Sequence, residues 1–143
     1  MKFALIAALA SGATASIISI QVPETIGLRK VIPVKLVNNI DQSNTYQTSI
    51  TFGLGTSPAD SSVVIGTPVS SIYLQDGNMP AAPFTKNMTL SAWAWGSKGK
   101  IGLRAAIFGA YGITGSIGTQ VYGANVTIGD ENSDNYVELQ FIQ

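Results

Sequence analysis

The sequence predicts an all-β protein, an immunoglobulin-like β-sandwich of about seven antiparallel strands. Its apolar residues come in short runs that are rich in β-branched side chains. Clusters of Gly, Pro, Asn, Asp and Ser separate these runs, as turns separate the strands of a sandwich. After the first fifteen residues, no stretch places apolar residues at helical spacing between capping residues. These three observations together favour two packed sheets over a fold that contains helices.

The first fifteen residues, MKFALIAALASGATA, have the features of a secretory signal peptide. Lys2 precedes an apolar run over residues 3–10, and Ala13 and Ala15 form a cleavage site of the small-x-small kind. The run is too short for a membrane helix, which needs about 20 apolar residues. We therefore expect residues 1–15 to be removed and residues 16–143 to be secreted as a single β-sandwich domain, without membrane insertion.

The expected strands follow the apolar runs. They cover residues 17–22, 31–38, 46–53, 69–74, 84–92, 101–111 and 120–128. Alternation with a period of two is clearest in the third strand, where Tyr46, Thr48, Ile50 and Phe52 share one face. Gln47, Ser49 and Thr51 share the other face. This pattern predicts a half-buried strand with Tyr46 on its core side.

The chain contains neither cysteine nor histidine. Without thiols the fold must be held by packing, and it would remain intact in a reducing cytosol. Without imidazole, a Ser-His-Asp hydrolase cannot be built and zinc lacks its usual ligands. The acidic residues lie mostly in turns, although a two-carboxylate glycosidase stays an alternative. We therefore expect no enzyme activity, no cofactor and no metal, and the absence of a basic patch argues against a nucleic-acid partner.

The segment SAWAWGSKGK, residues 91–100, contains both tryptophans of the chain. Residues two apart in a strand point the same way, so Trp93 and Trp95 share a face. If the strand continues without a bulge, that face is the outer one, and the tryptophans form a contact surface together with Lys98 and Lys100. If the strand ends near Ser91, the tryptophans instead cover one end of the core. An exposed pair would also suit a cell-wall or carbohydrate-binding module, which is the alternative function.

Two N-x-Thr motifs begin at Asn87 and Asn125. In both segments the apolar residues alternate with the asparagine, which places each asparagine on the outer face of its strand. Asn87 and Asn125 are therefore candidate sites of N-glycosylation in a secreted protein.

Three blocks of the sequence resemble the necrosis-inducing secreted protein family of fungal effectors. The blocks are ITFGLGTSPADSSVVIGTPVSSIYL (50–74), LRAAIFGAYG (103–112) and YGANVTIGD (122–130), and they follow the strand ISIQVPETI (18–26). The resemblance extends over nearly all of the chain after the signal peptide, and the order of the blocks makes it more specific than any one of them.

This resemblance implies a small β-sandwich that a fungus secretes to suppress pattern-triggered immunity in a plant host. It implies binding and inhibition of host receptor-like kinases and of their associated cytoplasmic kinases, and an association with host cell death. It also implies that the protein is secreted and then reaches the host cytoplasm, which the lack of cysteine would allow.

Overall fold

The computed structural model describes residues 15–40, 45–55, 65–74, 80, 82–91, 98–112 and 114–142, and within them every regular element is a strand. The strands are β1 (Ala15–Pro23), β2 (Thr25–Gly27), β3 (Ile32–Ile40), β4 (Tyr46–Gly55), β5 (Thr67–Tyr73), β6 (Phe84–Met88), β7 (Gly99–Tyr111), β8 (Ser116–Gly129), β9 (Tyr136–Glu138) and β10 (Gln140–Phe141). All seven expected strands are present, as β1 and β3 to β8. The short strands β2, β9 and β10 were not predicted.

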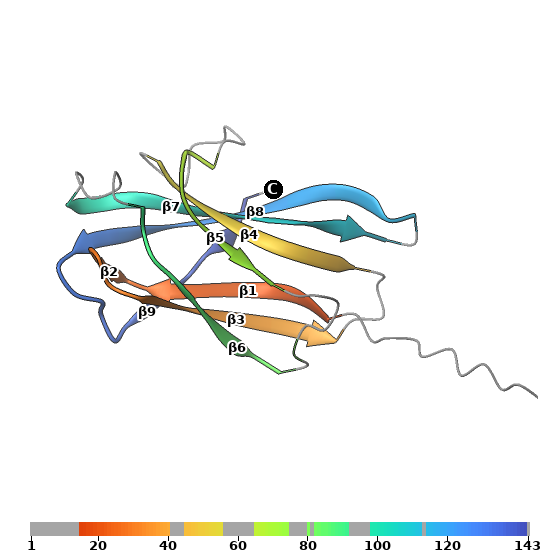
Figure 1. Ribbon diagram of the computed structural model, residues 1–143, viewed down its shortest axis with the longest axis horizontal. Coiled ribbons are helices and arrows are strands. Elements are labelled where there is room, and N and C mark those ends of the chain that lie inside the picture. The colour runs from red at the N-terminus through yellow and green to blue at the C-terminus, as the bar shows by residue number, and fades with distance from the viewer. Residues whose placement is uncertain are drawn as a thin grey trace, which may run out of the picture.

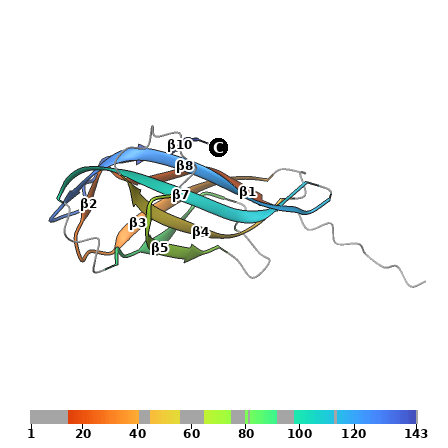
Figure 2. The ribbon, with the colours of Figure 1, turned by 90° about the horizontal axis from the view of Figure 1, so that it is seen from above.

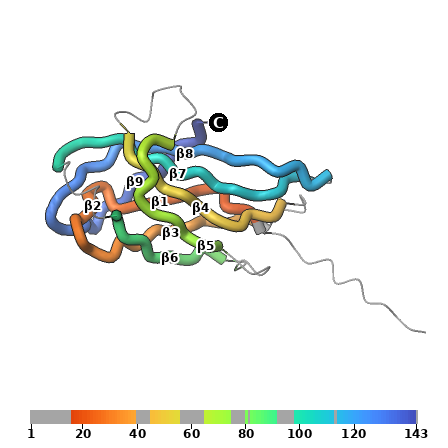
Figure 3. Tube along the Cα trace, turned by 45° about the horizontal axis from the view of Figure 1, so that its top comes forward, coloured from red at the N-terminus to blue at the C-terminus, as the bar shows by residue number. Residues whose placement is uncertain are grey.

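The strands form two packed sheets, which confirms the predicted β-sandwich. One sheet has the order β6-β3-β1-β9, and the other has the order β10-β8-β7-β4-β5 with β2 added beside β8. In Figure 1 the six-stranded sheet is the upper layer and the four-stranded sheet is the lower layer. Figure 2 shows β8, β7, β4 and β5 side by side from above. After β9, the chain leaves the four-stranded sheet and ends beside β8 (Figure 3).

A single hydrophobic cluster joins the inner faces of the two sheets. Leu36 comes from the four-stranded sheet, and Phe52 and Ile107 come from the six-stranded sheet; all three are fully buried. Burying one such side chain contributes about 1.5–3 kcal/mol. The fold is therefore held by apolar packing of the kind that a chain without cysteine requires.

The prediction that Tyr46 faces the core beside Ile50 and Phe52 is wrong. The register between β4 and β7 gains one extra β4 residue, Thr48, which is a β-bulge. Because side chains alternate with a period of two, one extra residue exchanges the two faces of the strand before it. Ile50 and Phe52 are buried as expected, whereas Tyr46 points outward and Gln47 points into the core.

Gln47 is fully buried and hydrogen-bonded at the bulge. Its Oε1 accepts a hydrogen bond from the backbone N–H of Ile17 in β1, at 2.7 Å, and its Nε2 lies 3.4 Å from Oε1 of Gln120 in β8. The side chain therefore ties the two sheets together. A buried amide is tolerated in an apolar core when its polar atoms have partners in this way.

The predicted signal peptide lies outside the described residues, apart from Ala15, which begins β1. In the described part of the chain, no helix could span a membrane.

Candidate functional site

The structure describes the predicted contact surface only in part. Trp93 and Trp95 fall in the segment 92–97, outside the described residues, so the face that they occupy stays a prediction. β6 ends at Met88 and not at residue 92 as expected. The phase of β6 therefore cannot be carried forward to the tryptophans.

Lys98 and Lys100 are both exposed where β7 begins. Lys98 Nζ lies 2.8 Å from Oδ1 of Asp130, and both side chains are exposed. The hydrogen bond and the positive charge of Lys98 lower the pKa of the Asp130 carboxyl. Arg104, the next cationic residue along the chain, is buried in the middle of β7. The basic surface at the turn thus consists of Lys98 and Lys100, with Lys98 already paired.

The turn that follows β8 gathers charge at this end of the sandwich. Besides the contact of Asp130, Glu131 Oε1 lies 2.6 Å from Nζ of Lys30, which follows β2. Exposed ion pairs of this kind contribute little to stability, because water already solvates both charges. Among the described residues, no three His, Cys, Asp or Glu side chains lie together as they would around a metal ion.

Asn87 and Asn125 are exposed on the outer faces of β6 and β8. Their neighbours Met88 and Val126 are buried, so the expected alternation is confirmed at both positions. The two asparagines therefore lie on opposite sides of the sandwich, and their glycosylation stays a prediction.

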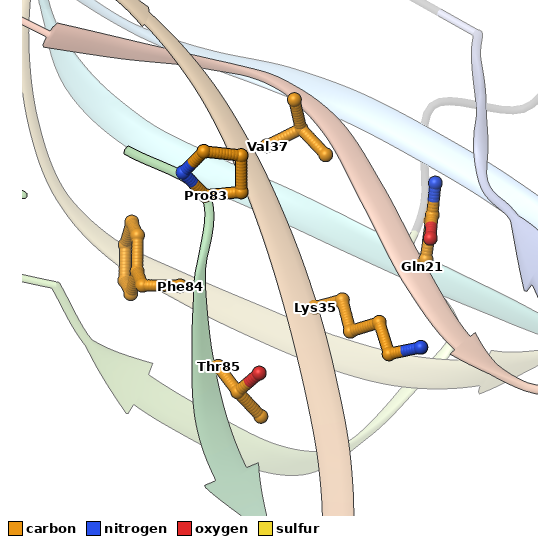
Figure 4. Close-up of a pocket in the computed structure, with 6 residues that line it drawn as sticks. All are labelled: Gln21, Lys35, Val37, Pro83, Phe84 and Thr85. Carbon is orange, nitrogen blue, oxygen red and sulfur yellow. The ribbon is translucent and has the colours of Figure 1, made fainter. Parts of the chain in front are cut away.

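The outer face of the four-stranded sheet has a shallow groove of about 220 Å³. Its lining residues, all drawn in Figure 4, are Gln21, Lys35, Val37, Pro83, Phe84 and Thr85. In Figure 4 the Lys35 side chain extends away from Phe84, along the sheet. Its ammonium lies 3.5 Å from the ring centroid of Tyr136 in β9, which is a cation–π contact. The polar groups of the lining belong to Gln21, Lys35 and Thr85, an arrangement that can bind a partner but lacks an acid paired with a base.

The outer face of the six-stranded sheet has a different character. Four large exposed side chains meet there, and we call this group the aromatic patch: Tyr46, Tyr73, Phe108 and Ile117. Their exposed fractions are 43%, 61%, 45% and 74%. Sequence reasoning missed the patch because it placed Tyr46 on the core side of its strand. The alternation of β7, with Ile107 inward and Phe108 outward, is the signal that could have revealed it.

The strand registers bring the aromatic patch together from four strands. In one row, Ser49 of β4 lies between Tyr73 and Phe108, and in the next row Ala110 lies between Tyr46 and Ile117. Neighbouring strands are about 4.8 Å apart, so the two large side chains of each row are about 10 Å from one another. The bulge at β4 is what moves Tyr46 into this group.

Comparison with known proteins places this sandwich in a family. The family model described as the Nis1 family matches residues 13–127, which begin two residues before β1 and end within β8. A search of curated proteins gives no significant match. The match covers well over half of the chain, and it agrees with the resemblance carried by the blocks at 50–74, 103–112 and 122–130. The chain therefore belongs to the Nis1 family, a family of necrosis-inducing secreted effectors.

Proposed function

We propose that this protein is a secreted effector that binds host receptor-like kinases and their associated cytoplasmic kinases, inhibits them, and so suppresses pattern-triggered immunity. Host cell death accompanies this activity. The observation that carries the proposal is membership of the Nis1 family over residues 13–127. The protein acts by contact and not by catalysis, and its partners are kinase domains.

Two features of the molecule support action by contact. The outer face of the six-stranded sheet exposes Phe108 and Ile117 to solvent, and large exposed apolar groups are typical of surfaces that bind proteins. The groove on the other sheet is shallow, and Lys35 in its lining is engaged by the ring of Tyr136. Among the residues that the structure describes, neither surface places a nucleophile beside a base, as enzymatic group transfer would need.

The packing of the core supports the proposed location. Leu36, Phe52 and Ile107 are fully buried, and with no cysteine in the chain the fold does not depend on an oxidising compartment. The same folded protein can therefore act outside the fungus and, after transfer, in the host cytoplasm.

The test is a binding and inhibition assay. The full chain is expressed in a secreting yeast, so that its signal peptide and any glycans are processed, and is titrated against the purified cytoplasmic domain of a plant receptor-like kinase. We expect saturable binding by calorimetry and loss of kinase activity as the complex forms. A secreted β-sandwich of another family serves as the control. Binding without inhibition, or no binding to any kinase in a panel, would contradict the proposal.

A cell-wall or carbohydrate-binding function is the second candidate. The exposed ring of Tyr73 favours it, because aromatic rings stack on sugars. The protein is mixed with insoluble chitin, glucan and cellulose, and a Trp93→Ala/Trp95→Ala double variant is compared with it. Retention of the wild type that is lost in this variant would support the wall-binding function. Equal retention of both proteins would show that the tryptophans do not contribute to wall binding.

A further inference from the structure

We propose that the aromatic patch is the face through which this protein binds its partner, and that the partner offers an uncharged, apolar surface of a folded protein domain. This inference rests on the proposed function, since the domain in question is that of a host kinase. It names the site, the chemistry of the matching surface and the salt dependence of binding.

The area of the patch is suited to the centre of a transient interface. A large side chain presents about 200 Å² when fully exposed, so the four exposed fractions amount to roughly 450 Å² of mainly apolar surface. Patches of about 300–600 Å² on a monomer are often functional. A standard complex buries about 800 Å² on each partner, whereas an obligate homodimer buries far more. The patch therefore fits the apolar centre of a heterocomplex better than a permanent contact with a second copy.

The charge distribution indicates what the patch can meet. The described side chains next to it on the sheet are uncharged; they include Thr48, Ser49, Thr51, Ser71, Ala106, Ala110, Thr119 and Val121. The ion pairs of Asp130 and Glu131 follow the opposite end of β8, roughly 40 Å along the strand from Ile117. Interface centres are depleted of charge and enriched in aromatic residues. A partner surface that matches the patch is therefore uncharged as well.

The details of the patch favour a protein over a polysaccharide. Beside the ring of Tyr46, its second row consists of Ala110 and Ile117, which offer neither a ring for stacking nor a hydrogen bond. Thr48 Oγ1 donates a hydrogen bond to the Phe108 carbonyl oxygen, at 3.3 Å, and Thr51 and Ser71 hydrogen-bond to one another, at 3.1 Å. These hydroxyls already have partners within the protein. Apolar protein side chains therefore match the patch better than the many hydroxyls of a sugar chain.

The candidate glycosylation sites leave the patch open. Asn125 is on the same outer face, but it lies opposite Gly102 and about 25 Å along β8 from Ile117. Asn87 is on the other sheet. Glycans at both positions would cover other parts of the surface.

The experiment compares two double variants of the full chain against the receptor-like kinase domain used above. Phe108→Thr/Ile117→Thr removes one aromatic and one aliphatic side chain from the patch. Phe141→Thr/Val31→Thr removes the same pair of side-chain types elsewhere, at exposed fractions of 62% and 57%. We expect the patch variant to bind at least about tenfold more weakly and the control variant to stay within about twofold of the wild type. We also expect the wild-type affinity to change by less than about threefold between about 0.05 and about 0.5 M NaCl, because no exposed charge is buried.

Circular dichroism and thermal unfolding verify that both variants fold. If the patch variant does not fold, Tyr73→Lys on the edge strand β5 replaces it, with the same expected loss. A patch variant that folds and binds like the wild type would overturn the inference while the proposed function stands. If the wild-type protein binds no kinase domain, both the proposed function and this inference are contradicted. The wild-type protein is also tested for self-association and for retention on glucan. If it shows either property and only the patch variant loses it, the choice of a kinase domain as the partner is overturned.

Discussion

The two outer faces of this sandwich cover the same core but differ in chemistry. The four-stranded sheet presents polar residues such as Gln21, Lys35 and Thr85 around a shallow groove. The six-stranded sheet presents the aromatic patch, which includes Phe108 and Ile117. Folding requires only the inner faces to be apolar, and an outer face in water is ordinarily polar or mixed. The difference teaches that the first face is a mixed surface, on which apolar residues such as Val37 and the exposed Ile18 lie among polar ones, whereas the second gathers several large exposed side chains that folding does not need.

The strongest test of this comparison concerns the outer face of the six-stranded sheet where Ile65 packs on it, at Gly53. A Cβ atom at Gly53 would overlap the backbone oxygen of Ile65, so Gly53→Ala forces the backbone to move. We expect the free energy of unfolding to fall by about 1–3 kcal/mol in urea titrations. Gly55→Ala is the control, since a Cβ there would meet nothing within 4 Å. Equal effects at both positions would show that the chain does not pack on this face as described.

The second test addresses the bulge that moves Tyr46 into the patch. Gln47→Leu leaves the N–H of Ile17 without its acceptor inside the core, so we expect a loss of about 1–2 kcal/mol in the free energy of unfolding. Burial raises the pKa of Tyr111 and the hydrogen bond of Gln47 partly offsets that rise, so the pKa should rise further in the variant, as followed by ultraviolet titration. Gln140→Leu on the exposed strand β10 is the matched control. Unchanged stability of the Gln47 variant would argue against the bulge.

The third test addresses the outer face of the four-stranded sheet. Lys35→Ala removes the cation from the ring of Tyr136, and we expect a loss of about 0.5–1 kcal/mol in the free energy of unfolding. Lys35→Met keeps most of the aliphatic chain, so comparing it with Lys35→Ala separates the effect of the lost charge from the effect of the lost side-chain packing. Kinase binding should be unchanged in both variants. Weaker binding would move the partner site from the aromatic patch to the groove.

The smallest effect at neutral pH is expected from the tyrosines. Burial raises the pKa of Tyr111 and Tyr122 above the ordinary value of 10.0. Their contribution to stability is therefore complete below pH 10.0, and it is lost as the pH rises from there through the folded-state values, because the unfolded chain releases these protons first. These two tyrosines should not change the thermal midpoint near neutral pH, and the midpoint should fall above pH 10.0. This fall should be less steep in the Tyr111→Phe and Tyr122→Phe variants than in the wild type. An equally steep fall in both variants would contradict the described burial.

Much of the fold was predictable, because strand positions depend on local sequence. Short β-branched runs between turn residues located all seven long strands, and alternation correctly placed Asn87 and Asn125 on outer faces. The short strands β2, β9 and β10 were missed, since two or three residues carry no periodic signal. The face of Trp93 and Trp95 stays a prediction because segment 92–97 lies outside the described residues.

The candidate site was less predictable than the fold. Tyr46 and Phe108 are 62 positions apart in numbering, and they share a patch only because β4 pairs with β7 in a register that contains one extra residue. A period of two cannot reveal such a residue, because each half of the strand keeps a regular alternation. The exposed aromatic rings were present in the sequence, but the pairing that gathers them was not.

By itself, the amino-acid sequence determined the all-β class, the positions of the long strands, a core held without disulfides and the resemblance to a family of secreted effectors, because these follow from local alternation, composition and motif order. Only the tertiary structure decided that Gln47 is buried, that Tyr46 is exposed, and that side chains from four strands meet in one uncharged patch. Those outcomes depend on strand register, and register is set by contacts between segments that are far apart along the chain.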